Sequence, residues 1–105
     1  MKIEIEKVIG LYYDESLNDP VKDKIDFGIL EAGKKTEKIL YIENKVDYNI
    51  HVEIDITGEG IAMSRHINEI APKKKGIVVL QFTPKITMMK PVEGTFDIKV
   101  NYVVG

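Results

Sequence analysis

The stretch that decides the fold is residues 48–57, which read Tyr48-Asn49-Ile50-His51-Val52-Glu53-Ile54-Asp55-Ile56-Thr57. Apolar and polar side chains alternate along its whole length. Successive side chains of an extended strand point to opposite faces, so a period of two gathers the apolar side chains on one face. The stretch is therefore predicted to be a β-strand that buries one face and exposes the other to solvent.

Similar strand signals recur along the chain. Residues 95–104 alternate in the same way, and residues 76–83 form a denser apolar run that Pro84 ends, because proline lacks the N–H of a sheet ladder. Further strands are expected at residues 35–43, 2–9, 25–30, 61–64 and 67–70. Seven to eight strands at short spacing predict an all-β fold, an immunoglobulin-like β-sandwich.

The inward faces of the four clearest strands predict the core. Its members share a strand face at a period of two: Leu40, Ile42, Ile50, Val52, Ile54, Val78, Leu80, Phe82, Phe96, Ile98 and Val100. Residues 14–24 contain Pro20 and carry no apolar stripe, so we expect a loop there. No internal repeat divides the chain, and residues 1–105 are predicted to form a single domain.

The composition narrows the classes of function. The chain carries 15 basic and 17 acidic residues, a net charge of -2 that provides no positive field for nucleic acid. It has no cysteine, so disulfides and thiolate metal sites are excluded. The first residues alternate charge with isoleucine, and no apolar run is long enough to span a bilayer. We therefore expect a cytoplasmic protein that binds neither nucleic acid nor membrane.

Several short motifs occur in an order and spacing typical of one domain family. They are Ile25-Asp26-Phe27-Gly28, Gly33, a strand ending in Glu43-Asn44, then Gln81-Phe82-Thr83-Pro84, and Gly94 before the last strand. Over residues 25–104 the chain resembles the ASH domain, an immunoglobulin-like module related to the major sperm protein fold. The resemblance implies a scaffolding or protein-docking module without catalytic residues.

The chain departs from this family in two places. The connection between Pro84 and Gly94 is longer than the family's usual one. The family also generally adds one more strand after the one expected here at residues 95–104. Either the amino-terminal segment fills that place, or an edge of the sheet is left open. We expect residues 2–9 to pair as a strand, because an open edge exposes unpaired N–H and C=O groups.

No group of residues forms a catalytic or cofactor-binding motif. His51, Glu53 and Asp55 share one strand face and are a candidate metal site, but a solvated sheet face explains them more simply. The three lysines at 73–75 are most simply a charged turn. No serine lies in a Gly-x-Ser-x-Gly elbow. We therefore expect no enzyme activity, no metal and no cofactor.

The connection after Pro84 is unusual because it is apolar. It carries Ile86, Met88, Met89 and Val92, although connections between strands normally lie on the polar surface. Methionine side chains adapt to many shapes and recur at surfaces that accept partners. The alternative is that this loop folds back and covers the open end of the sandwich. We interpret the four residues as a candidate interface for a protein partner or for self-association.

These observations predict a non-catalytic protein-interaction or assembly module. A carbohydrate-binding β-sandwich is the alternative, although the chain has no Trp and Tyr41 is its main aromatic candidate on an outer face. A small enzyme is the third possibility, and it would need a cleft with convergent polar groups.

Overall fold

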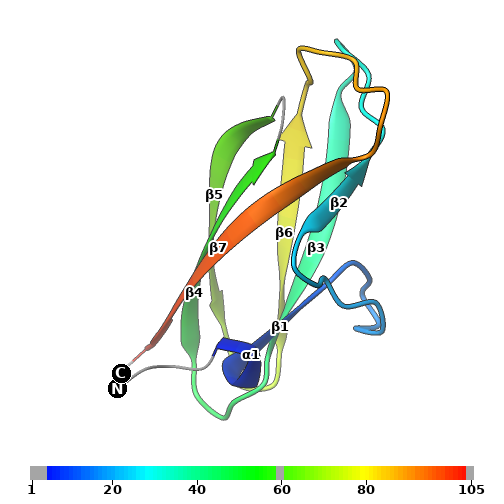
Figure 1. The fold of residues 1–105 in the computed structure, drawn as a ribbon. Helices are drawn as coiled ribbons and strands as arrows, with labels where there is room; N and C mark the ends of the chain where they lie inside the picture. Colours follow the sequence, from blue (N-terminus) through cyan, green and yellow to red (C-terminus); the bar gives the residue numbers. More distant parts are fainter. Residues whose placement is uncertain (1–4, 59–60, 104–105) are drawn as a thin grey trace.

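The computed structural model describes residues 5–58 and 61–103 (Figure 1). Its elements are α1 (Ile5–Val8), β1 (Ile9–Tyr12), β2 (Ile25–Gly28), β3 (Thr36–Asn44), β4 (Ile50–Gly58), β5 (Ile61–Ile70), β6 (Lys75–Phe82) and β7 (Val92–Tyr102). The strands form two packed antiparallel sheets, one in the order β1-β3-β6 and the other in the order β2-β7-β4-β5. The prediction of an all-β sandwich with seven to eight strands is confirmed.

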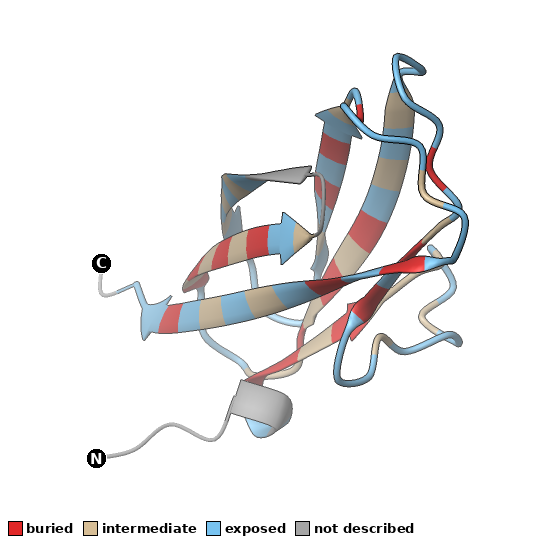
Figure 2. Cartoon of the chain, turned by 45° about the horizontal axis from the view of Figure 1, so that its top comes forward, coloured by how far each residue is buried: buried red, intermediate tan, exposed pale blue. Residues whose placement is uncertain are grey.

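The pattern of burial follows the alternation in the sequence. Along β4, Ile50, Val52, Ile54 and Ile56 are all 0% exposed, and the residues between them face the outside (Figure 2). Removing these β-branched side chains from water is the main force that holds the two sheets together. The strand that decides the fold is therefore the most deeply buried one.

Three residues predicted for the core are only half-buried. Phe82, Phe96 and Ile98 pack against the core, whereas the other eight predicted residues are buried. Phe82 is the last residue of β6, and its ring meets Phe27 edge to face at a centroid distance of 5.7 Å. The core also takes residues outside the prediction: Val8, Ile9, Leu11, Ile25, Phe27, Leu30, Ile56, Ile70 and Val92.

The amino-terminal segment differs from the prediction of a strand over residues 2–9. Residues 5–8 form the short helical turn α1, and residues 1–4 lie outside the described part. Val8 and Ile9 are both buried although they are consecutive, which the alternation of a strand does not allow. The chain therefore enters its first strand only at Ile9, and this strand, β1, pairs with β3 and not with β7.

Two short strands predicted at residues 61–64 and 67–70 are one continuous strand, β5. Arg65 and His66 continue the ladder, opposite Asp55 and Ile54 of β4. Residues 14–24 form the predicted loop, in which the Asp14 carboxylate accepts backbone N–H bonds from the turn that follows it. Arg65 and His66 lie between the two predicted strands, and both have a partner in the sheet.

A buried asparagine ties together the turns at one end of the sandwich. The side-chain amide of Asn44 donates hydrogen bonds to the carbonyl oxygens of Tyr48, Ile70 and Ala71, at 2.7, 3.0 and 3.1 Å. Its Oδ1 atom accepts the N–H of Val46 at 3.0 Å, as expected of a turn-capping side chain. Asn44 is fully buried, so these bonds replace the water that it loses.

Candidate functional site

The apolar connection between β6 and β7 lies at the end of the sandwich opposite Asn44, beside the loop of residues 29–35 (Figure 1). Gly28 and Gly33 shape that second loop, with φ angles of 72° and 77° that favour glycine. Hydrogen bonds join the two loops. They form one surface at this end of the molecule.

Three hydrogen bonds fasten the two loops to each other. The N–H of Met88 donates to the carbonyl of Leu30 at 2.9 Å, and the N–H of Gly33 donates to the carbonyl of Pro84 at 3.0 Å. The N–H of Ala32 also donates to Oγ1 of Thr87, at 3.1 Å. Backbone groups of the connection are therefore held in place rather than left to solvent.

The four candidate interface residues divide into two groups. Val92 is buried in the core, and Met88 is half-buried and packs against it. Ile86 and Met89 point outward and are 61% and 87% exposed. Assigning Val92 to an interface is wrong, because its side chain lies inside the sandwich at the start of β7. The loop therefore covers the sandwich end with two side chains and presents the other two to solvent.

Sequence reasoning missed a third exposed apolar residue at this end. Ile29 directly follows β2 on the neighbouring loop and is 68% exposed. A signal for it exists in the sequence, because a glycine at position 28 interrupts the alternation of the strand before it. We call Ile29, Ile86 and Met89 the loop-end surface.

A second apolar area covers the outer face of β3 and β6. Ile39 lies opposite Val79 and Tyr41 lies opposite Ile77, and all but the half-buried Tyr41 are exposed. Three of these side chains are aliphatic, whereas sugar rings are bound mainly by aromatic platforms. Tyr41 has the aliphatic Ile77 of β6 on one side and Tyr12 of β1 on the other.

The other tyrosine of this face is tied to its neighbours. Tyr12 of β1 lies opposite Tyr41, and its hydroxyl donates to Oε1 of Glu43 at 3.4 Å. Burial, and then the negative charge of Glu43, raises the pKa of Tyr12 above its ordinary value. The hydroxyl therefore stays protonated and serves as a hydrogen-bond donor within the sheet.

The candidate metal ligands lie on the outer face of the other sheet, as their spacing predicts. Nε2 of His51 is 3.4 Å from Oε1 of Glu53, but Asp55 turns to Arg65, whose Nε donates to Oδ1 at 2.8 Å. This hydrogen bond with Arg65 lowers the pKa of the Asp55 carboxyl. Among the residues that the structure describes, no group of three or more such side chains is arranged to hold a metal ion.

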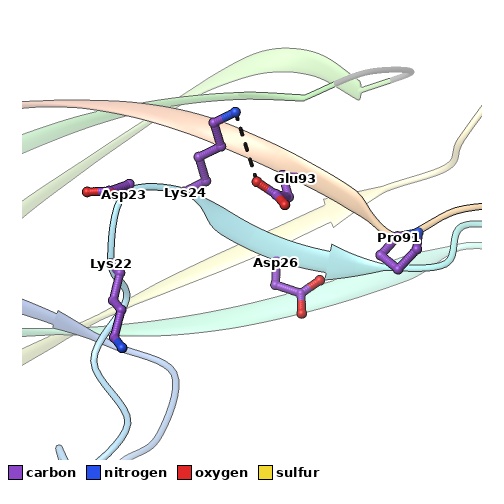
Figure 3. Close-up of a pocket in the computed structure, with 6 residues that line it drawn as sticks. All are labelled: Lys22, Asp23, Lys24, Asp26, Pro91 and Glu93. Carbon is purple, nitrogen blue, oxygen red and sulfur yellow. Dashed lines mark ion pairs between the residues drawn. The ribbon is translucent and has the colours of Figure 1, made fainter.

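One surface hollow is lined mostly by charged side chains of β2, β7 and the segments before them (Figure 3). It has a volume of about 410 Å³, and Nζ of Lys24 lies 3.9 Å from a carboxylate oxygen of Glu93. Asp26 points away from this pair and accepts the N–H of Gly28 at 2.9 Å. Catalytic carboxyl groups normally lie in clefts that exclude water. Here the Lys24 and Glu93 side chains are more than half exposed.

Lys73 and Lys74 lie in the turn between β5 and β6, and Lys75 is the first residue of β6. Nζ of Lys75 donates to the carbonyl oxygen of Glu15 at 2.7 Å, and Lys73 bonds the carbonyl oxygen of Lys45. Two of the three ammonium groups are thus bonded to loops of the same chain. The structure supports the interpretation of a charged turn.

Comparison with protein-family models, with curated proteins and with solved structures finds no match to this chain. In the part of the chain that the structure describes, no helix is long and apolar enough to cross a membrane. The function is therefore inferred from the surfaces of the molecule itself.

Proposed function

We propose that this chain is a non-catalytic protein-interaction module that binds a protein partner through its loop-end surface. The proposal rests on one observation. Ile86 and Met89 are exposed, although hydrogen bonds to the neighbouring loop hold the connection that carries them in place. Apolar side chains that gather at an exposed place on a soluble domain tend to mark an interaction site.

The loop is held in one conformation, which supports a role in binding. Met88 and Val92 anchor the connection from inside, and its backbone bonds to the loop of residues 29–35. A partner that docks on such a surface has little loop motion to freeze, so less of the binding free energy is lost to ordering. Ile29, Ile86 and Met89 are therefore presented in advance of binding.

The path of the chain supports an immunoglobulin-like assignment within this proposal. The chain passes from one sheet to the other at every connection between successive strands except that between β4 and β5. Crossings of this kind give the Greek-key connections of immunoglobulin-like sandwiches. Modules of the resembled ASH family dock other proteins, which agrees with the proposed function.

Replacing Ile86 and Met89 together by Glu tests this proposal. Both side chains face solvent, so the free energy of unfolding should change by less than about 0.5 kcal/mol. Proteins captured from the native cell by the immobilised domain, quantified by mass spectrometry, should lose the specific partner. A set of captured proteins identical to that of the wild-type chain would contradict the proposal.

Two control variants accompany this experiment. Met63→Glu changes a methionine of β5 that is 67% exposed and lies outside the loop-end surface, so capture should persist. Met88→Glu places a charge against the core and should lower stability by about 1–3 kcal/mol. If Ile86→Glu with Met89→Glu were as destabilising as Met88→Glu, the loop would be core lining and not an interface.

A further inference from the structure

Strand β7 has a flank that the described strands leave almost uncovered. On one side it pairs with β4 from Gly94 to Tyr102, but on the other side it pairs with β2 only at Val92, Glu93 and Gly94. No other described element makes a backbone hydrogen bond to that second side of residues 95–102. About half of the residues of an antiparallel strand direct their N–H and C=O groups to each side. This side of residues 95–102, the free flank, therefore presents donors and acceptors that no described backbone group pairs.

The apolar side chains along the free flank are also incompletely covered. Phe96 and Ile98 point inward between the sheets, opposite Ile56 and Ile54 of β4. The two β4 residues are 0% exposed, whereas Phe96 and Ile98 are only half-buried. The difference arises because β4 has a strand on both sides, and β7 lacks one here. Another strand on this flank would complete both the hydrogen-bond ladder and the core.

The other long edges of the two sheets lack this combination. On the inner face of β5, the side chains that precede its last residue, Ile70, are polar. They include His66 and Asn68. The Asn68 amide donates to the carbonyl oxygen of Ile77 on the edge strand β6, at 3.3 Å. The inward face of the β5 edge is therefore partly polar, and one edge carbonyl of β6 is already bonded.

The charges on the free flank are self-complementary. Asp97 and Lys99 are its only charged residues, and both lie on the outer face, two positions apart. Neither forms an ion pair within 4.0 Å with another described residue, although Lys99 lies opposite Glu53 of β4 and its charge helps to lower the pKa of Asp55. Edge strands are usually protected from self-pairing by charges. Charges of opposite sign fail to protect an edge from its own copy when the two strands run antiparallel.

We propose that two copies of this domain associate by pairing the free flanks of β7 as antiparallel strands centred on Ile98. A twofold axis makes such a contact mutual, so that each pair of residues occurs twice. Asp97 then lies opposite Lys99 of the second copy, and Lys99 lies opposite its Asp97. On the inner face, Phe96 meets Val100 of the second copy and the two Ile98 side chains meet each other.

The charges of Asp97 and Lys99, together with the position of β2, favour this register over the registers shifted by one step. A shift of the pairing by one step that keeps the same faces inward places Asp97 opposite Asp97, or Lys99 opposite Lys99. Like charges directly opposite each other are destabilising. Ile25 of β2 already occupies the position beside Gly94, so the second strand ends opposite Thr95. The proposed pair thus spans residues 95–101 of both copies.

Charge reversal tests the proposed register. The wild-type chain should show a dimer mass at high concentration by analytical ultracentrifugation. Asp97→Lys and Lys99→Asp should each weaken the dimer by at least about tenfold, because both variants set like charges opposite each other twice. An equimolar mixture of the two variants should dimerise again, because each Lys then faces an Asp. The Asp97→Lys/Lys99→Asp double variant should also dimerise.

Control variants separate this register from a general charge effect and from misfolding. Glu69→Lys makes the same change of charge as Asp97→Lys on the outer face of β5 and should leave the dimer intact. Melting curves of each variant report whether it is folded, and Asp97→Asn provides a milder version. A wild-type chain that stays monomeric at millimolar concentration would overturn the proposal, as would single variants that dimerise alone. None of these changes touches the loop-end surface, so the proposed function is tested separately.

Discussion

Strands β4 and β7 carry the same sequence pattern and lie side by side, yet they are buried to different depths. In β4, Ile54 and Ile56 are fully buried, whereas their neighbours in β7, Ile98 and Phe96, are half-buried. Both strands alternate at a period of two, so both send one face inward. The period specifies which face is buried, and the number of neighbouring strands decides how completely. Depth of burial therefore depends on partners that are distant in sequence.

Truncating matched isoleucines gives the largest expected difference between the two strands. Ile54→Ala should lower the free energy of unfolding by about 4 kcal/mol, because it leaves a cavity in the closed core. Ile98→Ala should cost about 1–2 kcal/mol, because its half-buried side chain has less packing to lose. Urea denaturation at a low protein concentration, where the domain is monomeric, measures both losses. Equal losses would show that the flank of β7 is covered after all.

The buried Asn44, whose side chain ties together the turns near the start of β4, provides the second test. Asn44→Ala removes the donor for the carbonyl oxygens of Tyr48, which precedes β4, and of Ile70, the last residue of β5. Each buried carbonyl left without a donor costs about 1–3 kcal/mol, so we expect a total loss of about 3 kcal/mol. Asn101→Ala changes an exposed asparagine of β7 and should have almost no effect. A loss for Asn44→Ala as small as for this control would mean that water replaces the lost donor.

Local pattern in the sequence predicts the strands and the faces that they bury. It identifies β3, β4, β6 and β7 and eight of the 17 buried core residues in the described part, because alternation is a property of consecutive residues. It fails at β1, where Val8 and Ile9 are both buried. It also splits β5, because Arg65 and His66 resemble a break until their partners in β4 are known. These errors arise where pairing between distant strands overrides a local signal.

The candidate interface shows the same limit. Its apolar content is visible in the sequence, but its division into inward and outward side chains is not. That division depends on bonds to another loop, such as the one between Ala32 and Thr87, which are 55 positions apart. Ile29 lies on that loop and joins the surface only because the two loops meet. Contacts of such long range have no local pattern.

The smallest expected effect concerns His66. It lies on β5 opposite Ile54, on the side of β4 that β5 covers. Its Nε2 atom is 3.0 Å from Oγ of Ser64, and partial burial lowers its pKa below the ordinary value. The unfolded chain then binds a proton at a higher pH than the folded chain does. Stability should therefore fall as the pH drops through about 6.5, and the fall should end below the lowered pKa of the folded state.

Replacing His66 by Gln should flatten this dependence between about pH 7.5 and 5.5, above the range where most carboxyl groups titrate. His51→Gln is the matched control, since His51 lies on the outer face of β4 beside Glu53. Urea midpoints measured across this range for the wild-type chain and both variants give the slopes. If His66→Gln kept the full wild-type slope, protonation of His66 would not be its source. A flattened slope in that variant alone would show that burial beside the isoleucines of β4 disfavours the charged form of His66.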